Sequence, residues 1–317
     1  MEKIFQKLSL SSATLVFVLL LGIFTTLFMQ TKPALDEFGL KFIVDKRWNQ
    51  TVPLTKTINM PTTQVSANDD TIDDEDDMIL DEDDEDSLVT KTVFGGLVPI
   101  IGTILSTLIA LIFALPIAMG IAVFLAEIAS KTLSKYVGIA IELLAAIPSI
   151  IFGMWGLYYF APIIADLFGG YQVSLLTAGL VLGIMILPFM AAITRDSMNT
   201  TPDVLKESAY ALGATKFEVI KDIIFPYSKV GIIGSIILAL GRALGETMAV
   251  AFLIGAVYSL PEKITDPTIS IPVAMAVNFG EASGLGESAL FYLGLILFIM
   301  SFAIISIAKF YFLKRVK

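Results

Sequence analysis

Apart from Lys309 near the end of the last apolar stretch, three charged residues lie inside long apolar stretches of the sequence, where a charge is costly: Glu142, Arg242 and Glu246. An ionisable side chain within the hydrocarbon of a bilayer costs several kcal/mol and is a functional candidate by default. The chain contains neither cysteine nor histidine, so thiolate nucleophiles, disulfides and the commonest metal ligand are excluded. The chemistry open to these residues is charge pairing or ion binding, and no catalytic or metal-ligating residue is predicted.

Arg242 and Glu246 are four residues apart, so a continuous helix would place them one turn apart on the same face. Helix rise puts Arg242 about 18 Å into its apolar stretch, near the bilayer centre. Two interpretations stay open. One is a structural ion pair; the other is an oxyanion site in which the planar guanidinium binds the ligand, Glu246 holds Arg242 in place and Thr247 adds a hydroxyl. Gly241 and Gly245 favour the second, because small residues let an ion approach the backbone.

Glu142, Arg195 and Asp196 are expected near the cytoplasmic surface. Helix rise places Glu142 about 7 Å inside the end of its apolar stretch, and a carboxylate there would repel an anion. We expect it to be a structural or gating partner of Arg195 or Lys135. For Arg195 and Asp196 the simpler alternative is that both side chains reach the interface as ordinary polar residues.

These residues must be positioned by helices that cross a membrane. The 317 residues are 56% apolar and 16% charged, and the mean hydropathy is +0.82, whereas a soluble chain is about 45 to 50% apolar and about 25% charged. A bilayer requires about 20 apolar residues of helix. Six such stretches occur, at about 10–29, 98–126, 137–160, 173–194, 230–257 and 288–312. The expected fold class is an all-α integral membrane protein with six transmembrane helices.

The distribution of lysine and arginine predicts the orientation. Both residues gather in the second and fourth connections and at both termini, which the positive-inside rule assigns to the cytoplasm of a multi-pass cell-membrane protein. The first apolar stretch is expected to be retained, because no small-residue cleavage site follows it. The predicted organisation is an N-terminal transmembrane helix (1–30), an extracytoplasmic loop (31–97), a transmembrane domain (98–312) and a cytoplasmic tail (313–317).

The extracytoplasmic loop contains an acidic insert at about 49–91. Its centre, from Asp69 to Asp86, has 13 carboxylates and no lysine or arginine. Without that centre the net charge of −9 becomes +4. Mutual repulsion and a lack of apolar residues predict disorder. A calcium loop of the EF-hand type would need a central glycine, which is missing, while non-specific divalent binding or contact with a basic outer partner stays open.

The connection between the fourth and fifth apolar stretches contains a distinctive segment, ESAYALGATKFEVIKDIIFP, from Glu207 to Pro226. Good helix formers at 203–212 and 216–224 predict two short amphipathic helices, with a turn at Gly213 and an end at Pro226. A solvated connector is the simpler alternative.

The spacing of this segment resembles the EAA motif of ABC importer permeases, Glu-Ala-Ala-x3-Gly-x9-Ile-x-Leu-Pro. The matching residues are Glu207, Ala209, Gly213, Ile223 and Pro226. Ser208 and Phe225 replace an alanine and the leucine of the motif. In that family the loop, here 203–226, is the coupling helix that docks on an ATP-binding subunit. The chain has no GxxxxGK[S/T] phosphate loop, so the resemblance implies that ATP and Mg bind a separate ATPase and that this chain carries no cofactor.

Longer strings narrow the resemblance. GRALGETMAV (241–250), IELLAAIPSIIFGMWGL (141–157) and TRD (194–196) resemble the permeases of phosphate-specific ABC importers, and the PstC type more than the PstA type, from about Phe94 to the C-terminus. The resemblance implies a type I importer permease core (MetI-like) in spans two to six. It also implies that Arg242 and Glu246 belong to the phosphate pathway, and that the chain is a transport subunit without an enzymatic site.

The same resemblance implies the partners. They are a homologous permease subunit (PstA type), a dimer of ATP-binding subunits (PstB type), an extracytoplasmic phosphate-binding protein (PstS type) and membrane lipid, with no nucleic acid. Two other functions stay open. One is the same fold with another oxyanion, such as sulfate or molybdate. The other is a secondary transporter or channel independent of an ATPase, which the absence of histidine argues against. A signalling role is suggested by the resemblance alone.

Overall fold

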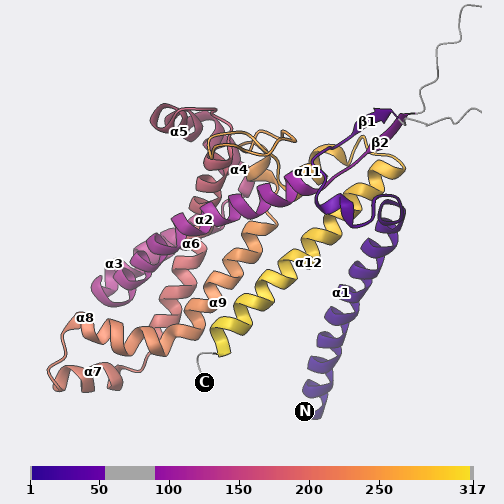
Figure 1. The fold of residues 1–317 in the computed structure, drawn as a ribbon. Coiled ribbons are helices and arrows are strands. Elements are labelled where there is room, and N and C mark those ends of the chain that lie inside the picture. Colours follow the sequence, from indigo (N-terminus) through magenta and orange to yellow (C-terminus); the bar gives the residue numbers. More distant parts are fainter. Residues whose placement is uncertain (1, 54–89, 315–317) are drawn as a thin grey trace, which may run out of the picture.

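The computed structural model describes residues 2–53 and 90–314, and the regular elements of this part of the chain are helices and one antiparallel pair of strands (Figure 1). The label η marks a short 3-10 helix (η1) or a π-helical turn (η2 to η4). The elements are α1 (Glu2–Phe38), η1 (Gly39–Ile43), β1 (Gln50–Pro53), β2 (Thr90–Val93), α2 (Leu97–Val123), η2 (Phe124–Ile128), α3 (Lys131–Ala145), α4 (Ser149–Trp155), η3 (Gly156–Phe160), α5 (Ala161–Phe168), α6 (Leu175–Asn199), α7 (Asp203–Ala211), α8 (Lys216–Glu218), η4 (Val219–Ile224), α9 (Phe225–Leu244), α10 (Met248–Ala251), α11 (Ile271–Asn278) and α12 (Leu285–Lys314).

Within the described ranges, six helical segments are long and apolar enough to cross a membrane. They are Ile4–Ile43, Leu97–Ile128, Ser149–Phe168, Leu175–Asn199, Lys216–Leu244 and Leu285–Phe310. The predicted number of spans and the all-α class are confirmed. The predicted bounds of the third and fifth spans are wrong.

The third predicted span, 137–160, is divided between two helices. α3 ends at Ala145, and α4 begins at Ser149 after Pro148, whose ψ of 137° is extended. Proline also disfavours the helical conformation of the residue before it, so the helix ends although the sequence stays apolar. α4, η3 and α5 then run on as one apolar segment. Glu142 therefore lies in α3 and outside the segment that meets the requirements for a membrane span, and its side chain is 61% exposed.

The fifth predicted span, 230–257, ends early. α9 finishes at Leu244, Gly245 leaves the helical conformation, and a four-residue α10 follows after Thr247. Arg242 consequently lies in the last turn of α9. The prediction that Arg242 and Glu246 occupy successive turns of one continuous helix is wrong.

The centre of the bundle is the contact between α2 and α6. α2 presents small residues at every fourth position, Ala110, Ala114, Ala118 and Ala122, and all are at most 1% exposed. A Cβ added to Gly183 of α6 would lie 3.0 Å from the carbonyl oxygen of Ala110. Small residues allow close approach of helices in a membrane, where dispersion replaces the hydrophobic effect as the driving force.

Aromatic pairs tie the N-terminal segment to the end of the bundle that carries the strands. Phe42 of η1 stacks on Tyr292 of α12 with ring centroids 4.5 Å apart, and Trp48 stacks on Tyr258 at 5.0 Å. The Tyr258 hydroxyl accepts a 2.8 Å hydrogen bond from the Asn278 amide. Burial raises the pKa of Tyr258, so its hydroxyl stays protonated and available at neutral pH.

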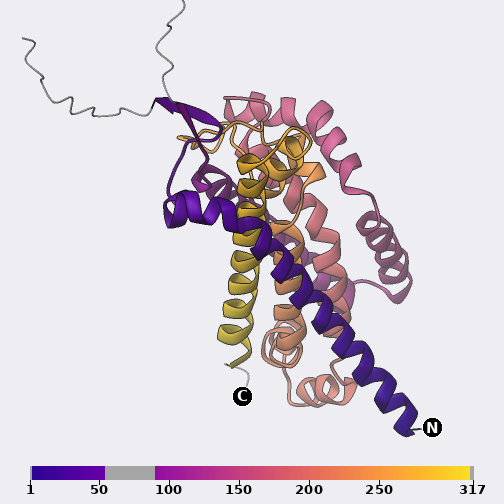
Figure 2. The same ribbon diagram turned by 90° about the vertical axis from the view of Figure 1, so that its right-hand side faces the viewer.

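The two ends of the bundle carry different elements. In both views the N-terminus, the C-terminus and the α7–α8 connection lie at one end, while the strands and α11 lie at the other (Figures 1 and 2). This arrangement agrees with the predicted placement of both termini on the side of the coupling segment. The acidic centre 69–86 lies outside the described residues, as do the last three residues of the tail.

Candidate functional site

The predicted coupling segment, 203–226, forms a helical hairpin at the end of the bundle where both termini lie (Figure 2). Gly213 has φ +89°, a left-handed conformation that glycine adopts without steric cost, so the predicted turn is confirmed. Its N–H donates to the carbonyl of Tyr210 at 2.9 Å, and the N–H of Ala214 donates to Ala209 at 3.1 Å. Both bonds satisfy carbonyls at the end of α7.

The second half of the segment differs from the prediction at its end. Thr215 caps α8 in a capping box, in which the Glu218 carboxylate accepts from the Thr215 N–H at 2.7 Å. The helix then passes through η4 into α9 without stopping at Pro226, which occupies one of the first two positions of α9. Pro226 removes one N–H donor from this continuous run, and the π-helical turn η4 lies immediately before α9. In this way the coupling segment is continuous with a membrane-spanning helix.

The five motif residues divide between two faces of the hairpin. Ala209 and Ile223 pack against a small buried cluster that consists of Ala122, Met198, Val219 and Ile224. Glu207 and Pro226 are exposed. On the outer surface of the hairpin, Leu212 is 90% exposed, and Val204 and Phe217 are each 70% exposed. These exposed apolar side chains are available for contact with another surface.

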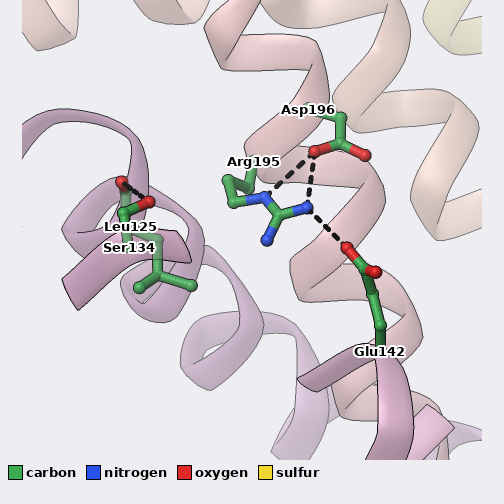
Figure 3. A network of polar contacts seen from close by, with 5 residues as sticks. All are labelled: Leu125, Ser134, Glu142, Arg195 and Asp196. Atoms are coloured by element: carbon green, nitrogen blue, oxygen red, sulfur yellow. Dashed lines mark hydrogen bonds and ion pairs between the residues drawn. The ribbon is translucent and has the colours of Figure 1, made fainter. Parts of the chain in front are cut away.

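Arg195, Asp196 and Glu142 form one ionic network, as Figure 3 shows. Nη2 of Arg195 lies 3.1 Å from Oε1 of Glu142 and 2.8 Å from Oδ1 of Asp196. The Arg195 side chain is only 11% exposed, because it crosses α3 at Gly138, where an added Cβ would overlap its guanidinium. The network joins α3 to α6, so the expected pairing of Glu142 with Arg195 is confirmed, whereas a gating role stays a prediction.

Arg242, Glu246 and Thr247 surround the break between α9 and α10. Arg242 is exposed, and neither it nor Glu246 forms an ion pair within the described part of the chain. The Glu246 carboxylate instead accepts from the N–H of Ala249 at 3.2 Å. Thr247 donates to the carbonyl of Gly245 at 3.4 Å, a long bond. The structural ion pair is therefore wrong for this conformation, and the guanidinium is left available for another anion.

Sequence reasoning missed an ion pair between two elements that lie far apart in the chain. Nζ of Lys206 in α7 lies 2.7 Å from Oε1 of Glu127 in η2. In the sequence, Lys206 is one of several lysines in the fourth connection. Glu127 is the one carboxylate near the end of the second apolar stretch, and this position was the signal available in the sequence. Lys206, Glu142 and Arg195 also line one cavity between η2, α3, α6 and α7.

A second missed feature is the seam between α6 and α9, which flank the coupling segment. Thr194 and Ser235 share a buried 2.9 Å hydrogen bond. Thr201, just after the end of α6, shares a longer one of 3.4 Å with Ser228. Between these pairs, Ser197 faces Gly231, which has no room for a Cβ. Hydroxyl pairs and a glycine at regular spacing hold the two helices close together.

We expect Gly231→Ala to destabilise this seam, because the added methyl overlaps the Ser197 side chain and overpacking costs about 1 to 3 kcal/mol. Thermal unfolding of the purified protein in detergent measures the effect. Gly234→Ala is the matched control, since a Cβ at Gly234 has nothing within 4 Å, and it should leave the unfolding temperature unchanged or raise it. Equal unfolding temperatures for the two variants would contradict the close seam.

Comparison with known proteins places the chain among transport permeases. The family described as "Binding-protein-dependent transport system inner membrane component" matches residues 114–317. The phosphate transport system permease protein PstC of Pasteurella multocida is 39% identical, covering 97% of this chain and 90% of that protein. PstC of Haemophilus influenzae is 37% identical, over 97% and 92%. A probable PstC of Methanocaldococcus jannaschii is 31% identical, over 98% and 93%.

Solved structures share the fold. A chain of the MetNI methionine ABC transporter in an inward-facing conformation superimposes with a TM-score of 0.52 at 20% identity, over 68% of this chain and 92% of that chain. A chain of a bacterial ABC transporter involved in import of the acidic polysaccharide alginate gives 0.53 at 15% identity, over 69% and 79%. At these identities the likeness supports the architecture of an ABC importer permease, and the substrate must be argued separately.

Proposed function

The chain belongs to the family of binding-protein-dependent transport system inner membrane components, and it is similar to PstC permeases over nearly its whole length. From this premise we propose that it is a permease subunit of an ATP-driven importer of inorganic phosphate. The observation that carries the proposal is 39% identity to a phosphate permease over 97% of the chain. Arg242 at the end of α9 is exposed and has no ion-pair partner among the described residues, which supports an anionic substrate.

The proposed assembly contains other subunits with distinct tasks. A homologous PstA-type subunit completes the pathway, a dimer of PstB-type subunits binds ATP and Mg, and a PstS-type protein delivers phosphate from outside. The exposed Leu212, Phe217 and Val204 supply an apolar surface for the ATP-binding subunit. Both termini would then lie in the cytoplasm, together with the α7–α8 connection (Figure 1).

The proposed mechanism is alternating access. ATP binding closes the ATPase dimer and moves the coupling segment with it. Because that segment continues through η4 into α9, its displacement is passed directly to the helix that carries Arg242. At the end of α9 the guanidinium offers planar, paired donors to phosphate. The adjacent carboxylate of Glu246 is held by the Ala249 N–H, which keeps it from neutralising Arg242.

Reconstitution of the four-component complex into vesicles tests this function. We expect uptake of radiolabelled phosphate that requires internal ATP and the binding protein and that excess unlabelled sulfate or molybdate leaves unchanged. Uptake without ATP would identify a secondary transporter, and inhibition by sulfate or molybdate would identify another oxyanion as the substrate. Either outcome would contradict the proposal.

A further inference from the structure

One ion pair of the coupling segment is largely shielded from water. The side chains of Lys206 and Glu127 are 16% and 10% exposed, and their charged atoms are 2.7 Å apart. Asp203 also lies near Lys206, at 3.9 Å, but its side chain is 88% exposed. A shielded pair resists separation, because removing one partner leaves the other charge without compensation.

The pair joins a weakly anchored helix to a firmly packed one. No residue of α7 is fully buried, and its apolar support is limited to the edge of the small cluster around Val219. By contrast, η2 continues α2 without a break, and α2 is packed along its length against α6. Among the described residues, the Lys206–Glu127 ion pair is the one that links α7 to η2, and through η2 to α2.

The local backbone of η2 aims Glu127 toward α7 and fastens the turn to its surroundings. The N–H of Ala129 donates to Phe124, five residues earlier, at 2.8 Å, so the π-helical turn rotates the side chains relative to α2. Ser134 of α3 donates to the carbonyl of Leu125 at 2.8 Å (Figure 3). Since α3 is joined to α6 by Glu142 and Arg195, contacts run continuously from α7 through η2 and α3 to α6.

We propose that the Glu127–Lys206 ion pair passes movement of α7 to α2, which makes both residues positioning residues for coupling. The inference rests on the proposed function and adds a second route to the direct one through η4 and α9. When the ATPase moves the hairpin, the pair pulls the end of α2 along with α7. Without it, α7 moves while α2 stays behind.

The test compares variants of the complete complex in vesicles by the number of phosphate ions imported per ATP hydrolysed. We expect Glu127→Gln and Lys206→Gln each to lower this ratio at least fivefold, while ATP hydrolysis and subunit composition stay near those of the unmodified complex. The unfolding temperature should fall in both variants, because each leaves one shielded charge without its partner. Lys206→Arg keeps the charge and should retain the ratio within twofold. The double variant Glu127→Lys/Lys206→Glu restores opposite charges, so its ratio of phosphate imported to ATP hydrolysed should be higher than that of Glu127→Lys or Lys206→Glu alone.

Asp203→Asn is the matched control, because it removes the exposed carboxylate beside Lys206 and should leave the ratio unchanged. A ratio within twofold of the unmodified value in Glu127→Gln would overturn the inference. So would an equal fall in Asp203→Asn, or loss of the ATPase subunit from the Glu127→Gln complex, which would make the pair a docking support only. Failure of the unmodified complex to import phosphate would instead reject the proposed function, so the two failures are distinguishable.

Discussion

Arg242→Gln is expected to lower ATP-driven phosphate uptake at least tenfold while leaving basal ATP hydrolysis by the complex unchanged. A hydrogen bond to a charged group contributes about 1.5 to 3 kcal/mol, and a loss of about 1.4 kcal/mol is tenfold in rate. Arg242 is exposed and has no ion-pair partner in the described part of the chain, so glutamine removes a charge without leaving a carboxylate unpaired. Uptake of radiolabelled phosphate in vesicles measures the effect.

The environment of Arg242 explains why a cation is stable there. It occupies the last turn of α9, where the partial negative charge of the free carbonyls favours a cation. The Arg242 side chain is exposed, so an anion has access to its guanidinium.

Two control variants test whether the effect comes from the charge and the paired donors of Arg242. Arg242→Lys keeps the charge but loses the paired donors, and should retain part of the uptake. Arg47→Gln removes an exposed arginine that pairs with Asp45 outside the spans, and should leave uptake unchanged. Uptake by Arg242→Gln within twofold of the unmodified complex would show that Arg242 does not handle the anion.

Gly213→Pro is expected to abolish coupling between ATP hydrolysis and transport. Proline requires φ near −65°, whereas Gly213 has φ +89°. Proline also lacks the N–H that donates to Tyr210 at 2.9 Å. The turn must therefore open, which separates α7 from α8 and divides the apolar surface that both present. We expect phosphate import to fall at least tenfold, with ATP hydrolysis no longer stimulated by the loaded binding protein.

Two control variants distinguish an effect of the turn at Gly213 from a general disruption of the hairpin. Gly213→Ala adds a methyl with nothing within 4 Å, so its cost is backbone strain alone, about 1 to 2 kcal/mol, and its effect should be intermediate. Asp203→Pro places proline at the first position of α7, where it is tolerated, and should leave import unchanged. Unchanged import in Gly213→Pro would remove the assignment of residues 203–226 to coupling.

Features that depend on neighbouring residues were predictable from the sequence. The six apolar stretches reflect the fixed thickness of a bilayer, and the turn at Gly213 reflects a backbone conformation that few other residues adopt. The capping box from Thr215 to Glu218 follows an equally local pattern. The motif positions Glu207 to Pro226 were recognisable for the same reason, although the continuation of the helix through Pro226 was not.

Helix breaks were not predictable from hydropathy, because apolar composition continues across them. The breaks at Pro148 and Gly245 divide stretches that look uniform in the sequence. Backbone groups released at such breaks must be satisfied by protein rather than by lipid, as the Glu246 carboxylate does for Ala249. Proline before serine and glycine before a polar pair were the available signals, but only packing decides whether they bend a helix or end it.

The amino-acid sequence was sufficient to predict a membrane-embedded fold, the number of crossings, the helical hairpin at 203–226 and the charges near the membrane helices, because each depends on composition or on short spacing. Which of these charges meet depends on tertiary packing. Glu127 and Lys206 are 79 positions apart, Glu142 and Arg195 are 53 apart, and Arg242 and Glu246, only four apart, do not pair. Ion pairs depend on the distance between side-chain atoms and on exclusion of water, and both quantities arise only when helices distant in the chain pack together.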